Sequence, residues 1–503
     1  MFSVSVPLSL LLLCQLLLAD TGQAAQQCHL ALKKNSLTGG GVSSSGADSV
    51  PTTTTTTATG TSAATATASS SSSSATPSST PFAYGKTPIR GVNLGGCLSL
   101  EPWITPSIFE NTNNDAIVDE YTFGSMQDSA TALSVLQNHW ATWITEDDFA
   151  AIAAAGLNHV RIPVGYWSVP LTSADTNQST SVEPYTPGMF DPGFLVGGSY
   201  HFFRSGAWPY LLKALNWAKQ YDIHVILDLH GAPGSQNGFD NSGQRTSTTE
   251  WENSSANQTR TVDTIRYFAE QLGGLVDIIE LLNEPATFLS DSYPATLRQY
   301  WQNGYSAIRA AGDTSNQVMI GDGFMGVDSW TDFMTYPGKC FALALQATFM
   351  LPQALPALSW IIIPELSRTF DEHISFACSS IADLSNFAKN NIWTVVGEWS
   401  TAPTDCTQWL NGRGVGARWD GTWYTPNTPL GSCAGWTGSY SNFSADYKTY
   451  WEVQVTMGES VQGWVYWTWK AENSDEWSYQ KGLEGGWIPQ DPTDRLYPNI
   501  CSS

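Results

Sequence analysis

Basic residues are scarce in this sequence. Its 503 residues include 22 Lys and Arg against 45 Asp and Glu, which gives a formal net charge of −23. A surface of this charge repels phosphate and anionic headgroups, so nucleic acid and acidic membranes are disfavoured as partners. Neutral ligands remain, and the 22 Trp residues offer flat apolar faces that suit sugar rings as well as they suit a protein core.

Metal-binding and phosphate-binding motifs are also missing. The sequence contains no Cys-x-x-Cys, no His-x-x-x-His and no His-Glu-x-x-His, so we expect neither a metal nor a cofactor. The glycine-rich stretch that begins at Gly231 lacks the Gly-Lys-Ser/Thr of a phosphate-binding loop and is expected to form a rigid turn.

The N-terminal part differs in composition from the rest of the chain. Residues 6–18 are almost all apolar and Gly22-x-Ala24 is a cleavage pattern, so residues 1–24 are interpreted as a secretory signal peptide. Because no Lys or Arg precedes the apolar run, an uncleaved anchor is the alternative. Residues 25–81, rich in Ser, Thr, Ala and Gly, are predicted to be a disordered linker. Residues 82–503 are predicted to form one domain of a secreted, extracellular or cell-wall protein.

Short β-rich runs alternate with helical stretches in this domain. The pattern predicts a parallel sheet wrapped by helices, and we expect a (β/α)8 barrel. A doubly wound open sheet is the alternative, but no Gly-x-Gly-x-x-Gly turn follows the first strand. The expected strands are residues 89–94, 158–164, 223–229, 276–282, 393–396 and 461–467, and the expected helices are residues 147–155, 208–220, 263–272, 383–389 and 450–459.

Two carboxylates stand where predicted strands end. Glu284 follows an apolar strand and precedes Pro285, and Glu398 ends the run Val-Val-Gly-Glu. The carboxyl ends of barrel strands meet on one face, where two carboxyl groups can cleave a glycosidic bond as acid and nucleophile. Taken singly, either acid could instead cap a helix or pair at the surface. A separation of about 5 Å would give retention of configuration and ~6.5–9.5 Å inversion, and we expect the retaining distance.

Five long motifs resemble a known family, the fungal secreted exo-1,3-β-glucanases of glycoside hydrolase family 5. With one gap, the resemblance runs from about Pro88 to Cys501. It implies retaining hydrolysis of β-1,3-glucan from non-reducing ends by a monomeric wall enzyme. Another family 5 β-glycosidase, endo-acting or of other linkage, and a non-catalytic wall-binding protein remain alternatives. The motifs are Arg-Gly-Val-Asn-Leu-Gly-Gly at 90–96, Leu-Glu-Pro-Trp at 100–103, Val-Arg-Ile-Pro-Val-Gly-Tyr-Trp at 160–167, Asp-Leu-His-Gly-Ala-Pro-Gly-Ser-Gln-Asn-Gly-Phe-Asp at 228–240 and Trp-Val-Tyr-Trp-Thr-Trp-Lys at 464–470.

The resemblance implies roles for residues within these motifs and between them. Glu284 would be the acid/base and Glu398 the nucleophile. Asn283 would bind the sugar 2-hydroxyl, which strengthens its hydrogen bond in the transition state. Arg161 would keep Glu398 ionised through the N–H donors of its planar, always charged guanidinium group. A salt bridge between barrel layers is the structural alternative for Arg161.

Five further residues are implied in sugar binding. His230 would line the sugar site, although a lone histidine could also be a satisfied core residue. Glu101 and Asp240 resemble the acids that bind hydroxyls of the terminal sugar, and either could instead cap a helix or turn. Trp467 resembles the floor on which the sugar ring stacks, and Phe239 one half of an aromatic clamp.

The resemblance also implies a pairing of cysteines. Cys378 would bond to Cys501 and Cys406 to Cys433, while Cys340 is our candidate for a free thiol. The states of Cys28 and Cys97 stay open. Sequons that suggest surface sugar occur at Asn177, Asn253, Asn257 and Asn442.

One stretch departs from the family pattern. Between Lys339 and Glu365 the family carries a strand with His-x-Tyr and then a second clamp Phe, but residues 340–363 contain no His or Tyr. We interpret this stretch as a mistranslated segment. Its length would suit a membrane span, but Pro352 and Pro356 argue against one. We expect a barrel without its sixth strand, with open edges and an incomplete site, and a segment that is looped out or poorly packed.

Overall fold

A computed structural model describes residues 81–171, 206–312, 316–335, 341–346, 369–423, 428–436 and 444–502. For 341–346 only the backbone is described. The predicted signal peptide, the predicted linker up to Thr80, Cys340 and the sequons at Asn177 and Asn442 lie outside these residues. All described residues belong to one unit, Thr80–Ser503.

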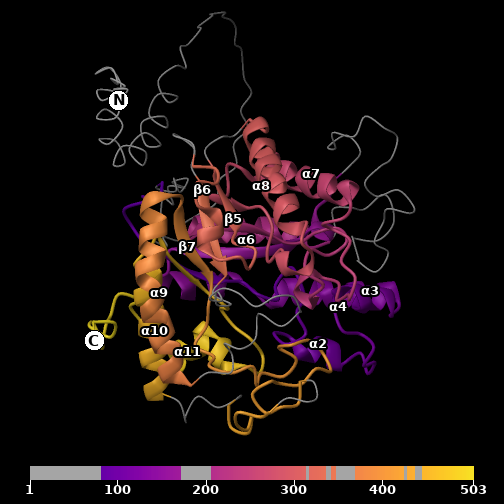
Figure 1. The fold of residues 1–503 in the computed structure, drawn as a ribbon. Coiled ribbons are helices and arrows are strands. Elements are labelled where there is room, and N and C mark those ends of the chain that lie inside the picture. Colours follow the sequence, from indigo (N-terminus) through magenta and orange to yellow (C-terminus); the bar gives the residue numbers. More distant parts are fainter. Residues whose placement is uncertain are drawn as a thin grey trace, which may run out of the picture. The chain divides into compact units, whose positions relative to one another are not determined.

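Eight parallel strands form a closed barrel in chain order, which confirms the predicted (β/α)8 architecture. The barrel closes where β1 pairs with β8, with Ile89 opposite Gly463 and Val92 opposite Tyr466. Figure 1 shows helices on the outside of the strands. The strands are β1 (Ile89–Asn93), β2 (His159–Gly165), β3 (His224–Gly231), β4 (Ile278–Glu280), β5 (Gln317–Gly321), β6 (Phe341–Gln346), β7 (Trp393–Glu398) and β8 (Gly463–Tyr466).

The helices follow the strands in the order of a βα barrel, with additional short helices in the loops. The α-helices are α2 (Pro106–Glu110), α3 (Glu120–Ser125), α4 (Ser129–Thr142), α5 (Glu146–Ala154), α6 (Trp208–Gln220), α7 (Ser255–Leu272), α8 (Tyr293–Ala310), α9 (Phe370–Asn390), α10 (Ser444–Glu459) and α11 (Tyr479–Gly485). Short 3-10 helices are η1 (Tyr166–Ser168), η3 (Asp240–Ser242), η4 (Thr287–Leu289), η5 (Val327–Trp330) and η7 (Asp475–Trp477).

The expectation of a missing sixth strand is wrong. Residues Phe341–Gln346, the start of the stretch that departs from the family pattern, form β6. This strand pairs with β5 through Val318 opposite Phe341 and with β7 through Gln346 opposite Glu398. A run of six residues with alternating Ala and Leu is enough to complete a parallel barrel, because the backbone supplies the pairing. The barrel therefore has no open edge at this strand.

The barrel interior changes from apolar to polar along the strands. One apolar residue from each of six strands forms a buried cluster, made of Ile89, Ile226, Ile278, Met319, Val395 and Val465. Since side chains on a strand alternate between two faces, the residues two positions later face the same interior. Those positions include Asp228 on β3, Glu280 on β4 and Trp467 just after β8. A layer of acidic and aromatic side chains therefore lies above the apolar layer, towards the carboxyl ends of the strands.

The chain before β1 packs against the opposite end of the barrel. Tyr84 and Phe82 pack against the apolar cluster of the barrel interior. The Tyr84 hydroxyl lies 3.0 Å from His159 Nε2, and the Phe82 ring meets the rings of His159 and His224 at centroid distances of 4.5 and 5.0 Å. This end is thus filled by aromatic side chains, which leaves the carboxyl end for ligands.

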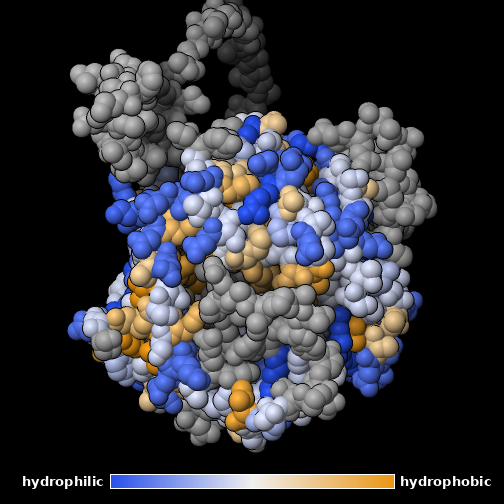
Figure 2. Space-filling model, viewed as in Figure 1, coloured by the Kyte–Doolittle hydropathy of each residue, from blue (hydrophilic) through white to orange (hydrophobic). Residues whose placement is uncertain are grey.

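The outer helices pack on the barrel through apolar faces, and a disulfide joins α9 to the C-terminal end of the chain. Helices α9 and α10 lie side by side outside β7 and β8 in Figure 1. The predicted bond between Cys378 on α9 and Cys501 is present, and so is the one between Cys406 and Cys433. The free cysteine of the described residues is the buried Cys97. On the face of the molecule that Figure 2 shows, hydrophilic residues are widespread and apolar residues are scattered among them.

Several element boundaries differ from the prediction, and caps explain two of them. Helix α7 begins before the predicted residue 263 because Ser254 caps it, accepting from Asn257 N–H. Helix α9 begins before the predicted residue 383 because Thr369 and Glu372 form a capping box. Strand β4 is shorter than the predicted 276–282. Among the described residues, no helix has the length and apolar character needed to cross a bilayer.

Candidate active site

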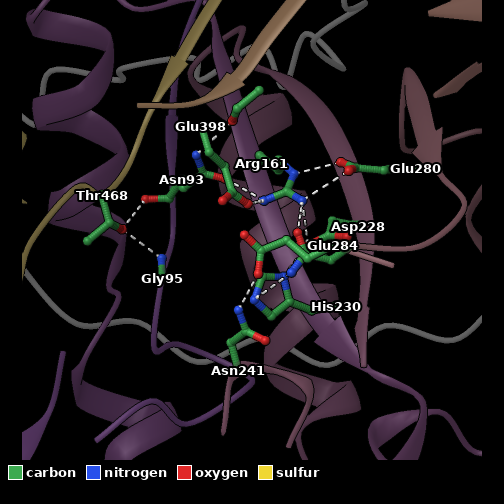
Figure 3. Close-up of polar contacts among 12 residues, drawn as sticks. Asn93, Gly95, Arg161, Asp228, His230, Asn241, Glu280, Glu284, Glu398 and Thr468 are labelled. Carbon is green, nitrogen blue, oxygen red and sulfur yellow. Dashed lines mark hydrogen bonds and ion pairs between the residues drawn. The ribbon is translucent and has the colours of Figure 1, made fainter. Parts of the chain in front are cut away.

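Arg161 on β2 is the centre of the polar layer. Its side chain is 1% exposed. It forms a two-point pair with Glu280, with Nε 2.6 Å from Oε2 and Nη2 3.0 Å from Oε1. Its Nη1 donates to Glu398 Oε1 at 2.5 Å and to Asn93 Oδ1 at 3.0 Å. Figure 3 shows the guanidinium between these acids, with Asp228 beside it. Arg161 therefore lies inside β2 and joins side chains from four other strands or strand ends.

The charges around Arg161 do not balance. Asp228, Glu280 and Glu398 all form ion pairs with this one cation. Burial alone would lower the pKa of Arg161, but these three carboxylates raise it well above its usual value. Burial raises the pKa of Glu280 to about 7, although Arg161 opposes the rise. The cluster consequently keeps Arg161 charged and holds protons on part of its carboxyl groups near neutral pH.

Glu398 is the last residue of β7, and its side chain is 12% exposed. Burial raises the pKa of its carboxyl group, the Arg161 guanidinium opposes this, and the neighbouring Glu284 adds to it. The residue before Glu398 helps to hold the strand end, because Asn93 Nδ2 donates to the carbonyls of Gly397 and Tyr466. The ends of β1, β7 and β8 are thus joined beside this carboxyl group.

Glu284 lies in the turn after β4 and is buried. Its backbone φ is 43°, a left-handed conformation that non-glycine residues adopt where the surroundings hold them. Gln236 supplies part of that support, since its Nε2 donates to the carbonyls of His230 and Asn283. Burial raises the pKa of Glu284, whereas the donated hydrogen bond from Asn241 Nδ2, 2.6 Å from Oε2, lowers it.

His230 connects the polar layer to an aromatic wall. Its Nδ1 donates to Asp228 Oδ2 at 2.6 Å, because a carboxylate can only accept. Its Nε2 lies 3.5 Å from Asn283 Nδ2, and Asn283 Oδ1 accepts from Arg161 at 2.9 Å. The His230 and Trp467 rings are nearly parallel, 6° apart, with centroids separated by 5.6 Å. These contacts fix the orientation of the His230, Asn283 and Trp467 side chains.

Glu101 and Asp240 each leave one carboxyl oxygen without a hydrogen bond, although Glu101 Oε1 lies 3.8 Å from His230 Nε2. Both side chains are buried, and neither Glu101 Oε1 nor Asp240 Oδ2 has a hydrogen-bond partner in the described part of the chain. Burial raises the pKa of Asp240 to about 7 and that of Glu101 well above its usual value, and each is increased further by a neighbouring acid. Unpaired buried carboxyl oxygens are costly, so they point to a ligand that supplies hydroxyl groups.

The other predicted residue, Phe239, lies on the loop after β3, directly before η3, and is half-buried. Its amide donates to Asn237 Oδ1. The structure thus brings eight of the nine predicted side chains into one cluster, joined by direct contacts and by charge interactions. The ninth, Phe239, directly precedes Asp240 at the half-buried edge of this cluster.

Sequence reasoning missed several residues of this cluster. Asp228, Glu280 and Asn93 contact Arg161 directly, and Asn241 contacts Glu284. The signal for Glu280 was available, because a charged residue inside an apolar strand must find a partner. Nothing in the local sequence distinguishes Asn241 from an ordinary turn residue. Among the described residues, no group of His, Cys, Asp and Glu has the arrangement of a metal site.

The fold and this cluster define a class of protein. A closed βα barrel that holds two carboxyl groups at strand ends, beside an arginine, a histidine and a tryptophan, is the architecture of a glycoside hydrolase. The "Cellulase (glycosyl hydrolase family 5)" model matches residues 124–343. "Glucan 1,3-beta-glucosidase 2" of Wickerhamomyces anomalus is 40% identical over 83% of this chain and 91% of that protein. "Glucan 1,3-beta-glucosidase" of Blumeria graminis is 38% identical over 84% and 91%. The chain belongs to glycosyl hydrolase family 5.

Solved structures support the fold. The rutinosidase of Aspergillus niger superposes with a TM-score of 0.56 at 18% identity, covering 80% of this chain and 98% of that one. At this identity the likeness concerns the architecture alone.

Proposed function

We propose that the protein hydrolyses β-1,3-glucan with retention of configuration and releases glucose from non-reducing ends. Glu398 is the proposed nucleophile and Glu284 the proposed acid/base. The observation that carries the proposal is that Arg161 contacts Glu398 at 2.5 Å while Glu284 receives only the neutral Asn241 amide. The names of the curated relatives support the substrate.

The different partners of the two acids determine where a shared proton resides. Two neighbouring buried carboxyl groups do not both ionise readily, because each negative charge raises the pKa of the other. A cation in contact favours ionisation of Glu398, whereas Glu284 lacks such contact among the hydrogen bonds described above. Burial raises the pKa of Glu398 well above its usual value and also raises that of Glu284. In this proposal the direct contact of Glu398 with Arg161 outweighs its burial. Glu284 therefore holds the proton, as a general acid requires, and Glu398 is ionised, as a nucleophile requires.

The reaction then proceeds in two displacements. Glu284 donates its proton to the glycosidic oxygen while Glu398 attacks the anomeric carbon, so the bond to the leaving chain breaks and a glycosyl ester forms on Glu398. Glu284, now a carboxylate, takes a proton from water, whose oxygen attacks the same carbon and releases Glu398. Two inversions give glucose with the β configuration of the substrate.

The remaining predicted residues form the proposed sugar site. Glu101 and Asp240, with their unpaired oxygens, accept from hydroxyl groups of the terminal glucose. Asn283 and His230, fixed by Arg161 and Asp228, bind the hydroxyls nearest the reacting carbon. Trp467 supplies the stacking face.

Phe239, at the rim, contacts the sugar beyond the scissile bond. All these residues come from one chain, so a monomer suffices. With residues 1–24 as signal peptide and 25–81 as linker, the protein is secreted and acts on cell-wall glucan.

The test is hydrolysis of laminarin by the secreted full chain and its variants. We expect glucose as the first product, initially as the β anomer by proton NMR. Glu398→Gln should reduce turnover by about three orders of magnitude or more while laminarin binding stays measurable, because a nucleophile is lost without loss of shape. Glu484→Gln, at an exposed helix position paired with Lys481, is the matched control and should be fully active.

Other outcomes would point to the alternatives. Oligosaccharides without glucose would indicate an endo-acting enzyme, and glucan binding without hydrolysis by the wild type would indicate a wall-binding protein. Unchanged laminarin hydrolysis by Glu398→Gln would refute the assignment of the nucleophile.

A further inference from the structure

Arg413, on the long loop after β7, is buried but has no buried acid as its partner among the contacts described for it. Its Nη1 donates to the carbonyls of Ile117 at 2.6 Å and Asn114 at 3.0 Å, both on the segment between α2 and α3 that follows β1. Its guanidinium also lies 4.8 Å from the centre of the Trp409 ring. One side chain thus joins the β7 loop to the β1 loop.

The acidic neighbour of Arg413 contributes little to this junction. Asp115 lies 3.3 Å from Arg413 Nη2, but its side chain is fully exposed. Exposed ion pairs contribute little to stability, because water screens the two charges. The orientation of Arg413 is consequently set by the two backbone carbonyls and the Trp409 ring, which the planar guanidinium can engage at once.

A second arginine extends the junction to the loop after β3. Arg245 Nη1 donates to the carbonyl of Arg413 at 2.9 Å, and the Arg245 amide donates to Asp119 Oδ2 at 2.6 Å. The Arg245 side chain lies directly against the backbone of Gly412, whose φ is 105°, because a Cβ at this position would lie 3.0 Å from Arg245 Nη1. The loops after β1, β3 and β7 are therefore tied together through Arg413 and Arg245.

These same three loops carry the proposed sugar-binding groups. Glu101 lies on the β1 loop, and Asp240 and Asn241 lie on the β3 loop, where Asn241 contacts Glu284. On the β7 loop, Trp409 packs against the cluster that contains Trp103 and Trp467. The junction thus adjoins both acids: Trp103 of this cluster donates to Glu101 at 3.0 Å, and Asp119 and Arg245 are the charged neighbours of Asp240.

We infer that Arg413 is a positioning residue that ties these loops into a closed wall beyond the terminal glucose, and so limits the enzyme to release of single glucose units. The inference rests on the proposed exo action and adds its structural cause. An open groove would let a glucan chain extend past the terminal sugar site. Loops held by hydrogen bonds to backbone carbonyls do not open at low cost, because the carbonyls would be left buried and unpaired.

The test uses the secreted full chain with Arg413→Met, which keeps an unbranched stem beside Trp409 but removes every donor. We expect inhibition by glucose to weaken about tenfold and KM for laminaribiose to rise similarly, as loss of charge-assisted hydrogen bonds implies. We also expect laminaribiose and longer products from borohydride-reduced laminarin. The kcat for an aryl β-glucoside should stay within about threefold, because Arg413 touches no reacting atom.

Two further variants make the result decisive. Arg266, on α7, is a half-buried arginine that pairs with Asp263 and Glu270. Arg266→Met is the matched control and should leave the products and KM unchanged. If Arg413→Met does not fold, Arg413→Lys, which can reach only part of the donor set, should show the same changes to a smaller extent. Folded Arg413 variants that release glucose alone, with wild-type glucose inhibition, would overturn the inference. A wild type that releases no glucose would instead overturn the proposed exo action.

Discussion

Asn241 Nδ2 lies 2.6 Å from Glu284 Oε2, so the proposed acid/base receives a hydrogen bond from a neutral amide on the loop after β3. A donor to the charged form of a carboxyl group lowers its pKa, and Asn241 does this for Glu284. The loop that is proposed to bind the sugar is thus coupled to the ionisation of Glu284, the proposed acid/base.

Asn241→Ala should therefore move the basic limb of the pH–rate profile to higher pH. Without the donor, the pKa of Glu284 rises further, and Glu284 stays protonated, and active as an acid, over a wider range. The measurement is kcat against pH with an aryl β-glucoside. Asn237→Ala is the control, because Asn237 donates to Asn241 Oδ1 but makes no contact with Glu284. A basic limb that moves to lower pH in Asn241→Ala would contradict the coupling.

The predicted strand ends gave the two carboxyl groups, and the family resemblance gave the other candidate residues. Glu398 was expected at a strand end and is the last residue of β7. His230 and Trp467, taken from the resemblance, lie at or next to the ends of β3 and β8. Arg161, which the resemblance placed beside Glu398, lies inside β2. Its partners Asp228, inside β3, and Glu280, the last residue of β4, could be found only by pairing charges across strands.

The loops and the sixth strand were less predictable, for different physical reasons. The contacts of Arg413 with the Asn114 and Ile117 carbonyls join residues about 300 positions apart, and backbone acceptors leave no mark in the sequence. Strand β6, with the sequence Phe-Ala-Leu-Ala-Leu-Gln, was missed because it carries neither the His nor the Tyr that the family has in this strand. Backbone pairing does not need such a residue.

Buried carboxyl groups should make the protein less stable as the pH rises. Burial raises the pKa of Glu120, Asp240 and Glu476 to about 7 in each case. A carboxyl group whose folded pKa is raised stabilises the fold when protonated, and this contribution is lost as the pH rises from its unfolded value, 4.5 for Glu476, through about 7. His139 acts in the opposite direction, since burial lowers its pKa to about 4.

Glu476→Gln isolates one of these groups. Glu476 accepts from Thr407 at 2.8 Å, and an amide oxygen can keep this contact. Relative to the wild type, the variant should gain roughly 3 kcal/mol between pH 4.5 and pH 8, because it no longer has to ionise in a buried position. Thermal unfolding at the two pH values gives the difference. An equal change in unfolding free energy between the two pH values, in wild type and variant, would show that the pKa of Glu476 does not change on folding.

The two disulfides should differ in what they stabilise. Cys378 and Cys501 are 123 residues apart and Cys406 and Cys433 are 27 apart, which corresponds to about 5 and ~3.5 kcal/mol in the chain-entropy model. Replacing the first pair by serine should lower the melting temperature more. Replacing the second pair should raise KM for laminaribiose more, because Arg413 lies within the loop that it closes. Equal KM values in both double variants would argue against this division.

The sixth strand offers a test of the stretch that departs from the family pattern. Gln346 pairs with Glu398 in the barrel register, and position 344 is two residues before it, the spacing of His-x-Tyr. We predict that Ala344→His/Gln346→Tyr raises both the folded yield and the rate of glucose release, since the pair would add hydrogen bonds beside the proposed nucleophile. The same pair one residue earlier, Leu343→His/Leu345→Tyr, belongs to the opposite face of the strand and should lower the yield. A wild type that already matches its relatives in rate, with no gain in the first variant, would mean that this barrel works with a sixth strand of a different kind.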